Sequence, residues 1–178
     1  GYTFAGWDKD IPATMPDGGL VLTAQWTPLY ETVEEDGLLT ITKYVGEDVE
    51  TITIPNAIDG RTIEGVGAEA FRGLKNVKEI VLPSTVTRIG EKAFEGCSSL
   101  TTIVLPDGLK KIDARAFANC TSLTEIFIPA SVKFIDVKAF SGCTQLANIN
   151  CGASSQPVAW DDDWNAGCSA TVNFGQTR

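Results

Sequence analysis

The chain has 178 residues, of which 43% are hydrophobic, and this is enough apolar material for a sizeable core. Its 23 acidic and 14 basic residues give a net charge of −9, which would repel nucleic-acid phosphates and anionic membrane surfaces. The sequence has no histidine, which excludes Ser-His-Asp catalysis and most zinc sites. No apolar run approaches the roughly 20 residues that a membrane span needs. We therefore expect no nucleic-acid partner, no membrane insertion and no cofactor.

Residues 1–28 open the chain with G-Y-T-F-A-G-W, an M-P turn and the predicted strand V-L-T-A-Q-W. These motifs resemble the second half of a Listeria-Bacteroides type repeat, an internalin B-repeat-like module with a β-grasp-like fold. The opening strand of such a module is missing here, so we expect a partial β module of two or three strands that buries little area. The acidic stretch 29–37 is predicted to be a linker.

A repeat of 23 residues dominates the rest of the chain, which we predict to be one domain over 38–178. It begins with an N-terminal cap at 38–48, where alternating apolar and polar residues predict a strand. Five extra residues in the first unit, within N-A-I-D-G-R-T-I-E-G, predict a bulge at this end of the array. The columns that define the period are Phe71, Phe94, Phe117 and Phe140, each preceded by alanine; Pro83, Pro106 and Pro129; Cys97, Cys120 and Cys143; and Ile89, Ile112 and Ile135.

Each unit is expected to form one coil of a solenoid. In the third full unit Leu123, Ile126 and Ile128 have the spacing L-x-x-I-x-I, which places both isoleucines on one face of a strand. Proline ends the strand, and a single helical turn with Ala139 and Phe140 closes the coil. Because no unit can bury its own apolar face, the units must stack. The predicted fold is an α/β solenoid of about five repeats, capped at both ends, with a parallel sheet on one side.

These motifs resemble the BspA-like leucine-rich repeats of bacterial surface proteins, over about residues 38–175. The resemblance implies an extracellular or cell-surface location and an adhesin-like role for a piece of a larger protein, whose signal and anchor lie outside this sequence. Residues 151–178 resemble the C-terminal cap of such arrays. In that cap we expect Trp160, Trp164, Val172 and Phe174 to pack on the last turn.

Cysteines form a second structural column. Cys97, Cys120 and Cys143 would stack about 5 Å apart, which is within reach of a disulfide, but their inward positions favour buried free thiols. Zinc is disfavoured because these ligands form a line with no fourth partner. Cys151 and Cys168 lie outside the column and could form a disulfide in an oxidising compartment.

Three consecutive aspartates, Asp161, Asp162 and Asp163, raise the question of calcium binding. They lack the alternating Asp-x-Asp spacing and the following glycine of a calcium loop. The alternative that we favour is an exposed N-terminal cap for a short helix at 164–168.

Residues between the inward strand positions point outward and form two exposed columns. The first is Thr51, Glu79, Thr102, Glu125 and Asn148, and the second is Thr53, Val81, Val104, Phe127 and Asn150. Val81, Val104 and Phe127 would form a contiguous apolar stripe, which is typical of a partner site, although β-branched and aromatic residues also simply favour strands. The predicted partner-binding residues are Val81, Val104, Phe127, Glu79, Thr102, Glu125, Asn148 and Asn150.

Several functions remain open at this point. Glu79 and Glu125 would lie about 9.5 Å apart, within the range of glycosidase carboxylates, but nothing supplies a pocket around them, so we predict no enzyme. The leading hypothesis is a module that binds a protein of a host or bacterial surface. The alternatives are a carbohydrate-binding module that uses Phe127, a spacer without a ligand, and self-association through a poorly capped first turn.

Overall fold

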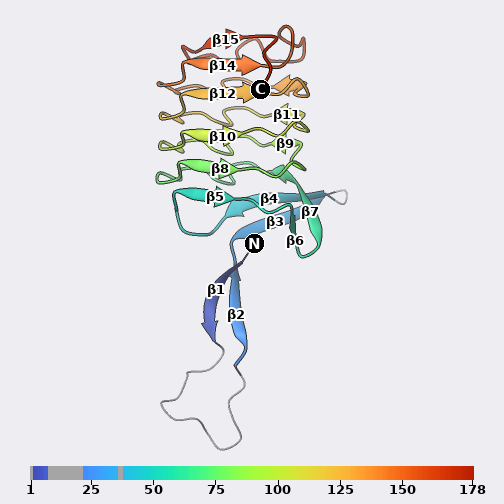
Figure 1. Cartoon of the computed structure of the whole chain (residues 1–178), viewed down its shortest axis with the longest axis vertical. Coiled ribbons are helices and arrows are strands. Elements are labelled where there is room, and N and C mark those ends of the chain that lie inside the picture. Colours follow the sequence, from blue (N-terminus) through green and yellow to red (C-terminus); the bar gives the residue numbers. More distant parts are fainter. Residues whose placement is uncertain (1, 8–21, 36–37) are drawn as a thin grey trace, which may run out of the picture.

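The computed structural model describes residues 2–7, 22–35 and 38–178. In this part of the chain the coils stack along one axis, from the N-terminal strands to the C-terminal cap (Figure 1). Six strands on one side, which we call the main face, mark about six turns, where the sequence predicts about five repeats. They are β5 (Thr51–Thr53), β8 (Glu79–Val81), β10 (Thr102–Val104), β12 (Glu125–Ile128), β14 (Asn148–Cys151) and β15 (Thr171–Asn173).

The main face is parallel throughout but is not one continuous ladder. Strands β5, β8 and β10 form one hydrogen-bonded sheet, and β12, β14 and β15 form another. The interruption lies between β10 and β12. Inward side chains are buried on the first five of these strands, as the period predicts: Ile52, Ile80, Ile103, Ile126 and Ile149.

A second sheet covers another side of the coil, which the sequence analysis missed. Strands β9 (Arg88–Ile89), β11 (Lys111–Ile112) and β13 (Phe134–Ile135) stack in parallel on β7 (Arg61–Val66). Strands β9, β11 and β13 have only two residues each, which is too short for a visible alternation of apolar and polar residues in the sequence. We call this side the second face.

No helix occurs in the described residues, so the α/β class and the predicted helical turn at Ala139 and Phe140 are wrong. The segment before each Ala-Phe pair contains a residue in the left-handed region, with φ of 54° at Lys92 and Arg115 and 57° at Lys138. A right-handed helix cannot continue through such a residue. The coil is closed by short turns, for example Cys97 N–H to Phe94 O at 3.2 Å.

The predicted linker at 29–37 contains a strand. Here β3 (Tyr30–Glu35) pairs antiparallel with β4 (Leu38–Tyr44), the predicted capping strand, which in turn pairs parallel with β7. Tyr30 anchors β3, because its buried hydroxyl donates to Thr53 O over 3.2 Å. The acidic composition belongs to an edge strand that exposes Glu31 and Glu34 to solvent, and exposed charges are a common protection against edge pairing.

The five-residue insertion forms the bulge that the sequence predicts. Strand β6 (Ala57–Ile58) pairs antiparallel with β7 through a tight turn at Asp59 and Gly60, with φ of 51° and 76°. Strands β1 (Tyr2–Trp7) and β2 (Ala24–Pro28) form a two-stranded antiparallel sheet beyond the array (Figure 1). Tyr2 Oη donates to Asp59 at 2.9 Å, which connects that sheet to the bulge. The M-P turn lies outside the described residues, and the division into 1–28, 29–37 and 38–178 stays a prediction.

The predicted phenylalanine column forms the centre of the core. Its four rings are fully buried and stacked, with centroid distances of 5.5, 5.3 and 5.4 Å from Phe71 to Phe140. Tyr44 stacks on Phe71 at one end, and Trp164 meets Phe140 edge-on at the other, 5.9 Å away. Trp164 and Trp160 are both buried, so the prediction that these tryptophans pack in the cap is confirmed. Burial of each ring contributes on the order of 1.5–3 kcal/mol.

Candidate functional site

The main face presents the two outward columns that the sequence predicts. Strand pairing places Thr102 beside Glu79 and Val104 beside Val81, and places Asn148 beside Glu125 and Phe127 beside Asn150. All predicted members are exposed or half-buried. The columns continue to Thr171 and Asn173 on β15. These two residues follow Asn148 and Asn150 by one full period, so counting on past the cap would have found them.

The apolar stripe is exposed at its first two positions. Val81 is 41% exposed and Val104 is 55% exposed, while Phe127 is half-buried. Thr102 and Glu125 lie next to the stripe, and together with Val104 and Phe127 they line a hollow of about 340 Å³. The hollow lies at the interruption of the hydrogen-bond ladder between β10 and β12. Glu79 is outside it, so the two glutamates of the glycosidase hypothesis do not share one site.

Phe127 is held between two groups that the sequence analysis did not connect with it. The Arg178 guanidinium carbon lies 4.8 Å from the centroid of the Phe127 ring, on the hollow. Beside the ring is Gly152, where an added Cβ would come within 3.3 Å of the ring and 2.9 Å of the Ala130 nitrogen. Gly152 occupies the position where the preceding units have proline, and this change in the repeat was the sequence feature that could have indicated a special site here.

The C-terminal end of the main face is an amide network. Asn173 Nδ2 donates to Asn150 Oδ1 at 3.0 Å and lies 3.4 Å from Asn148 Oδ1. Two of the predicted partner-binding residues are therefore bonded to a third asparagine. The main face thus has an apolar half and an amide half.

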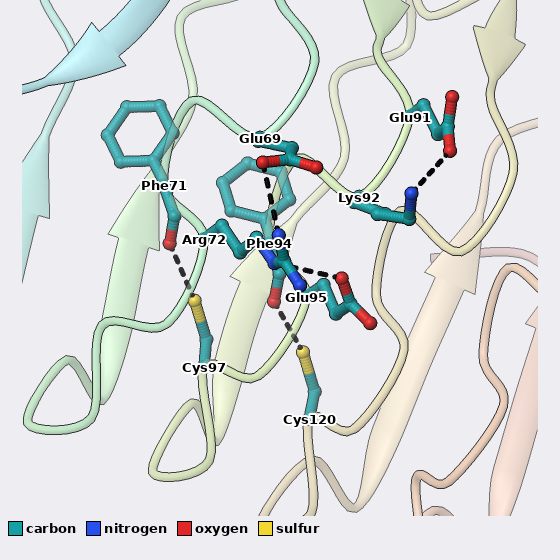
Figure 2. A network of polar contacts seen from close by, with 9 residues as sticks. All are labelled: Glu69, Phe71, Arg72, Glu91, Lys92, Phe94, Glu95, Cys97 and Cys120. Carbon is teal, nitrogen blue, oxygen red and sulfur yellow. Dashed lines mark hydrogen bonds and ion pairs between the residues drawn. The ribbon is translucent and has the colours of Figure 1, made fainter.

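The cysteine column is buried, and its thiols are bonded to the backbone. Each thiol donates to a phenylalanine carbonyl of the preceding turn: Cys97 to Phe71 at 3.1 Å and Cys120 to Phe94 at 3.2 Å (Figure 2), and Cys143 to Phe117 at 3.1 Å. Burial raises the pKa of Cys97 to about 12, so the thiol stays protonated. No cluster of three or more potential metal ligands occurs among the described residues. These observations support a structural column.

The disulfide considered for Cys151 and Cys168 is not formed, and all five cysteines are free thiols in the structure. Cys151 lies in the inward row of the main face, beside Ile128. Cys168 lies instead in the turn before β15, where burial and the nearby Cys143 both raise its pKa. The two cysteines belong to different columns of the coil.

Comparison with known families matches residues 43–160 to the BspA type leucine rich repeat region, in six copies. The chain belongs to this family. Among solved structures it is similar to the leucine rich repeat protein TpLRR of T. pallidum, at 31% identity and a TM-score of 0.67, covering 84% of this chain and 64% of that one. A leucine-rich repeat protein of Bacteroides ovatus matches at 31% identity and a TM-score of 0.61, covering 82% of this chain and 35% of the other.

The BspA-type array also shares its fold with a leucine rich cell surface protein of Faecalibacterium prausnitzii, at 22% identity and a TM-score of 0.52, over 93% of this chain and 55% of that one. The chain spans less than two thirds of the length of each of these relatives. No curated protein matches it. No helix long and apolar enough to cross a membrane is found in the described part of the chain. Repeat solenoids of this kind generally serve as structural or binding modules with extended binding surfaces.

In the C-terminal cap of the BspA-type array, the aspartates close a turn and cap no helix. Asp161 Oδ1 accepts from Asp163 N–H at 2.8 Å, and Asp161 O accepts from Trp164 N–H at 3.1 Å. The helix predicted at 164–168 is absent, since this segment forms turns. Trp164 is instead fixed by its contact with Phe140 and by a bond from Nε1 to Gln156 at 3.3 Å.

The second face of the BspA-type array has a hollow of its own, which the sequence analysis missed. It measures about 280 Å³ and is lined by Lys111, Phe134 and Val158 among others. Phe134 is 50% exposed, and Val158 is fully exposed. Basic residues gather on the neighbouring surface: Arg88, Lys110, Lys111 and Lys133. The sequence feature that could have indicated this face is the column of Arg88, Lys111 and Phe134, which are one period apart and each precede an inward isoleucine.

Proposed function

We propose that this chain is the protein-interaction module of a secreted or surface-exposed bacterial protein, and that it binds a protein partner on the apolar half of the main face. The observation that supports this best is the exposure of Val81 and Val104, which are neighbours in register on an open sheet. Contiguous apolar side chains on a sheet face are costly in water unless a partner covers them.

The surroundings of the stripe also favour a protein partner. Thr102 and Glu125 form a polar border around Val104 and Phe127, and an apolar centre with a polar rim is the usual anatomy of a protein interface. The surface location is supported by the family and by the cell surface protein with the same fold. The partner could belong to a host or to another bacterium.

The carbohydrate alternative has less support. Sugar binding by stacking needs an open aromatic face, and the Phe127 ring has the Arg178 guanidinium above it. Self-association through the first turn is also less favoured, because the edge strand β3 displays Glu31 and Glu34 to solvent.

Binding to immobilised extracellular-matrix proteins and to cultured cells tests the proposal. Val104→Glu places a charge in the centre of the stripe and should weaken partner binding at least about tenfold, in line with an interface anchor. Val158→Glu is the matched control, because it makes the same change at an exposed valine away from the main face. If both variants bind as the unchanged chain does, the main face is not the partner site.

A further inference from the structure

Residues 175–178 return to the main face. Gly175, with φ of 72°, turns the backbone after β15, and its N–H donates to Ala153 O at 2.7 Å. Gln176 N–H then donates to Cys151 O at 2.9 Å. The C-terminus consequently lies near β12 and not beyond the last turn (Figure 1). From there the Arg178 side chain enters the hollow between β10 and β12.

Three different groups contact the guanidinium of Arg178, which lines that hollow. The ring of Phe127 lies 4.8 Å from its carbon, Leu105 O accepts from Nη2 at 2.7 Å, and Asp107 Oδ1 lies 3.5 Å from Nη1. A planar, delocalised cation with several N–H donors satisfies a ring face, a carbonyl and a carboxylate together, whereas an ammonium is a compact point charge. The hollow is matched to arginine and less well to lysine.

The carbonyl in the hollow is available because of a proline. One turn later, Gly152 N–H donates to Ile128 O at 2.9 Å, which is the bond that a residue with a free N–H makes at this position. The equivalent donor for Leu105 O would be residue 129, which is a proline and has no N–H. A buried or half-buried carbonyl that lacks a hydrogen-bond donor raises the free energy of the fold. The Arg178 guanidinium supplies a donor to Leu105 O.

The other parts of the hollow are also built by the array. Gly152 leaves room for the Phe127 ring, and no other turn combines an aromatic outward residue with a proline-freed carbonyl in the main-face strands described. Glu125 lines the same hollow and adds negative charge. The Arg178 side chain is accessible from solvent, since it is 42% exposed and its ionic partner Asp107 is 89% exposed.

We infer that this hollow is a guanidinium-binding site that receives an arginine side chain of the protein partner, and that Arg178 occupies it in the free chain. The inference rests on the proposed function and adds the chemistry of the partner: an exposed arginine next to apolar residues that cover Val81 and Val104. A partner arginine replaces Arg178 on the same three groups. The negative charge of the hollow favours such a basic partner.

The test uses N-acetyl-arginine amide as the probe and the full chain with Arg178→Ala. Nuclear magnetic resonance should show saturable shifts at Leu105, Asp107 and Phe127, with affinity at least about tenfold higher than in the unchanged chain, where Arg178 competes. N-acetyl-lysine amide should give a response at least about fivefold weaker. Adding Phe127→Ala to Arg178→Ala should abolish the response, while adding Phe134→Ala, a matched change on the second face, should leave it intact.

The inference is overturned if the arginine probe gives no saturable response, if the lysine probe binds equally well, or if Phe127→Ala has no effect in a variant that remains folded. The proposed function is tested separately by Val81→Glu with whole partners, because Val81 belongs to the exposed stripe but does not line the hollow. Partner binding that Val81→Glu weakens, without an arginine response, overturns the guanidinium site alone. An arginine response without any partner whose binding Val81→Glu weakens supports the site and overturns the proposed function.

Discussion

The Cys120 thiol donates a hydrogen bond to the carbonyl oxygen of Phe94 in the preceding turn, over 3.2 Å. The same carbonyl accepts from Cys97 N–H, also at 3.2 Å, so two successive turns share one acceptor. A serine in this place would need partners for its oxygen lone pairs, whereas a thiol is a weak donor that tolerates apolar surroundings. The column therefore joins the turns without importing a strongly polar group into the core.

Replacing this thiol should destabilise the array. Cys120→Ala removes the bond and leaves a small void in a fully buried position, and we expect a loss of about 1–2 kcal/mol in the free energy of unfolding. Cys168→Ala, at a half-buried position in the cap, should cost less than about 1 kcal/mol. Urea unfolding of both variants measures the difference. Equal losses would show that the buried column has no special role.

Alkaline pH should weaken the fold through the same column. Burial raises the pKa of Cys97 to about 12, compared with about 8.5 for an exposed thiol. Below about pH 8.5 both the folded and unfolded states keep the proton, so this thiol adds no pH dependence. Between about 8.5 and 12 only the folded state keeps it, and stability falls by about 1.4 kcal/mol per pH unit for each such thiol.

Urea unfolding at pH 8 and pH 10 measures this effect. Cys97→Ala should show a smaller loss between the two pH values than the unchanged chain, and Cys151→Ala should behave in the same way, because burial raises the pKa of that thiol to about 12 as well. An unchanged pH dependence in both variants would contradict the assignment of protonated, buried thiols.

The phenylalanine column should be the most sensitive part of the array. Phe117 is fully buried and stacks on rings on both sides, so Phe117→Ala should cost about 3–5 kcal/mol. Phe134→Ala makes the same change at a half-exposed ring on the second face and should cost less than about 1 kcal/mol. Thermal unfolding followed by circular dichroism compares them. Similar melting temperatures for the two variants would contradict the stacked core.

The sequence was sufficient for those parts of the fold that repeat. Once the interval between Phe94 and Phe117 was known, it predicted which strand residues face the core and which face solvent, including Val81 and Val104. It did not predict the left-handed conformations of Lys92 and Arg115, because lysine and arginine are not residue types that indicate a positive φ. These left-handed residues prevent the helical turn that was expected here.

Features outside the period were harder to predict. Strand β3 was not predicted because its acidic residues are equally compatible with a linker and with an exposed edge strand. The contact of Arg178 with Phe127 joins two turns that are distant in sequence, and only the stacking of the coils brings them together. Pro129 and Gly152, which help to build this contact, are visible in the sequence. Their effect can be inferred only when the strand pairing shows that Leu105 O lacks its hydrogen-bond donor.

Pro129→Ala tests that account of the hollow. The alanine N–H can donate to Leu105 O as Gly152 N–H donates to Ile128 O, and it would then compete with Arg178. We expect slow hydrogen exchange at residue 129 and increased mobility of the Arg178 side chain, both measured by nuclear magnetic resonance. Pro106→Ala is the control, because it supplies the equivalent donor to Leu82 O, where no arginine competes. It should gain the slow exchange and leave Arg178 unchanged. Rapid exchange at residue 129, with Arg178 still ordered, would show that the proline does not create the site.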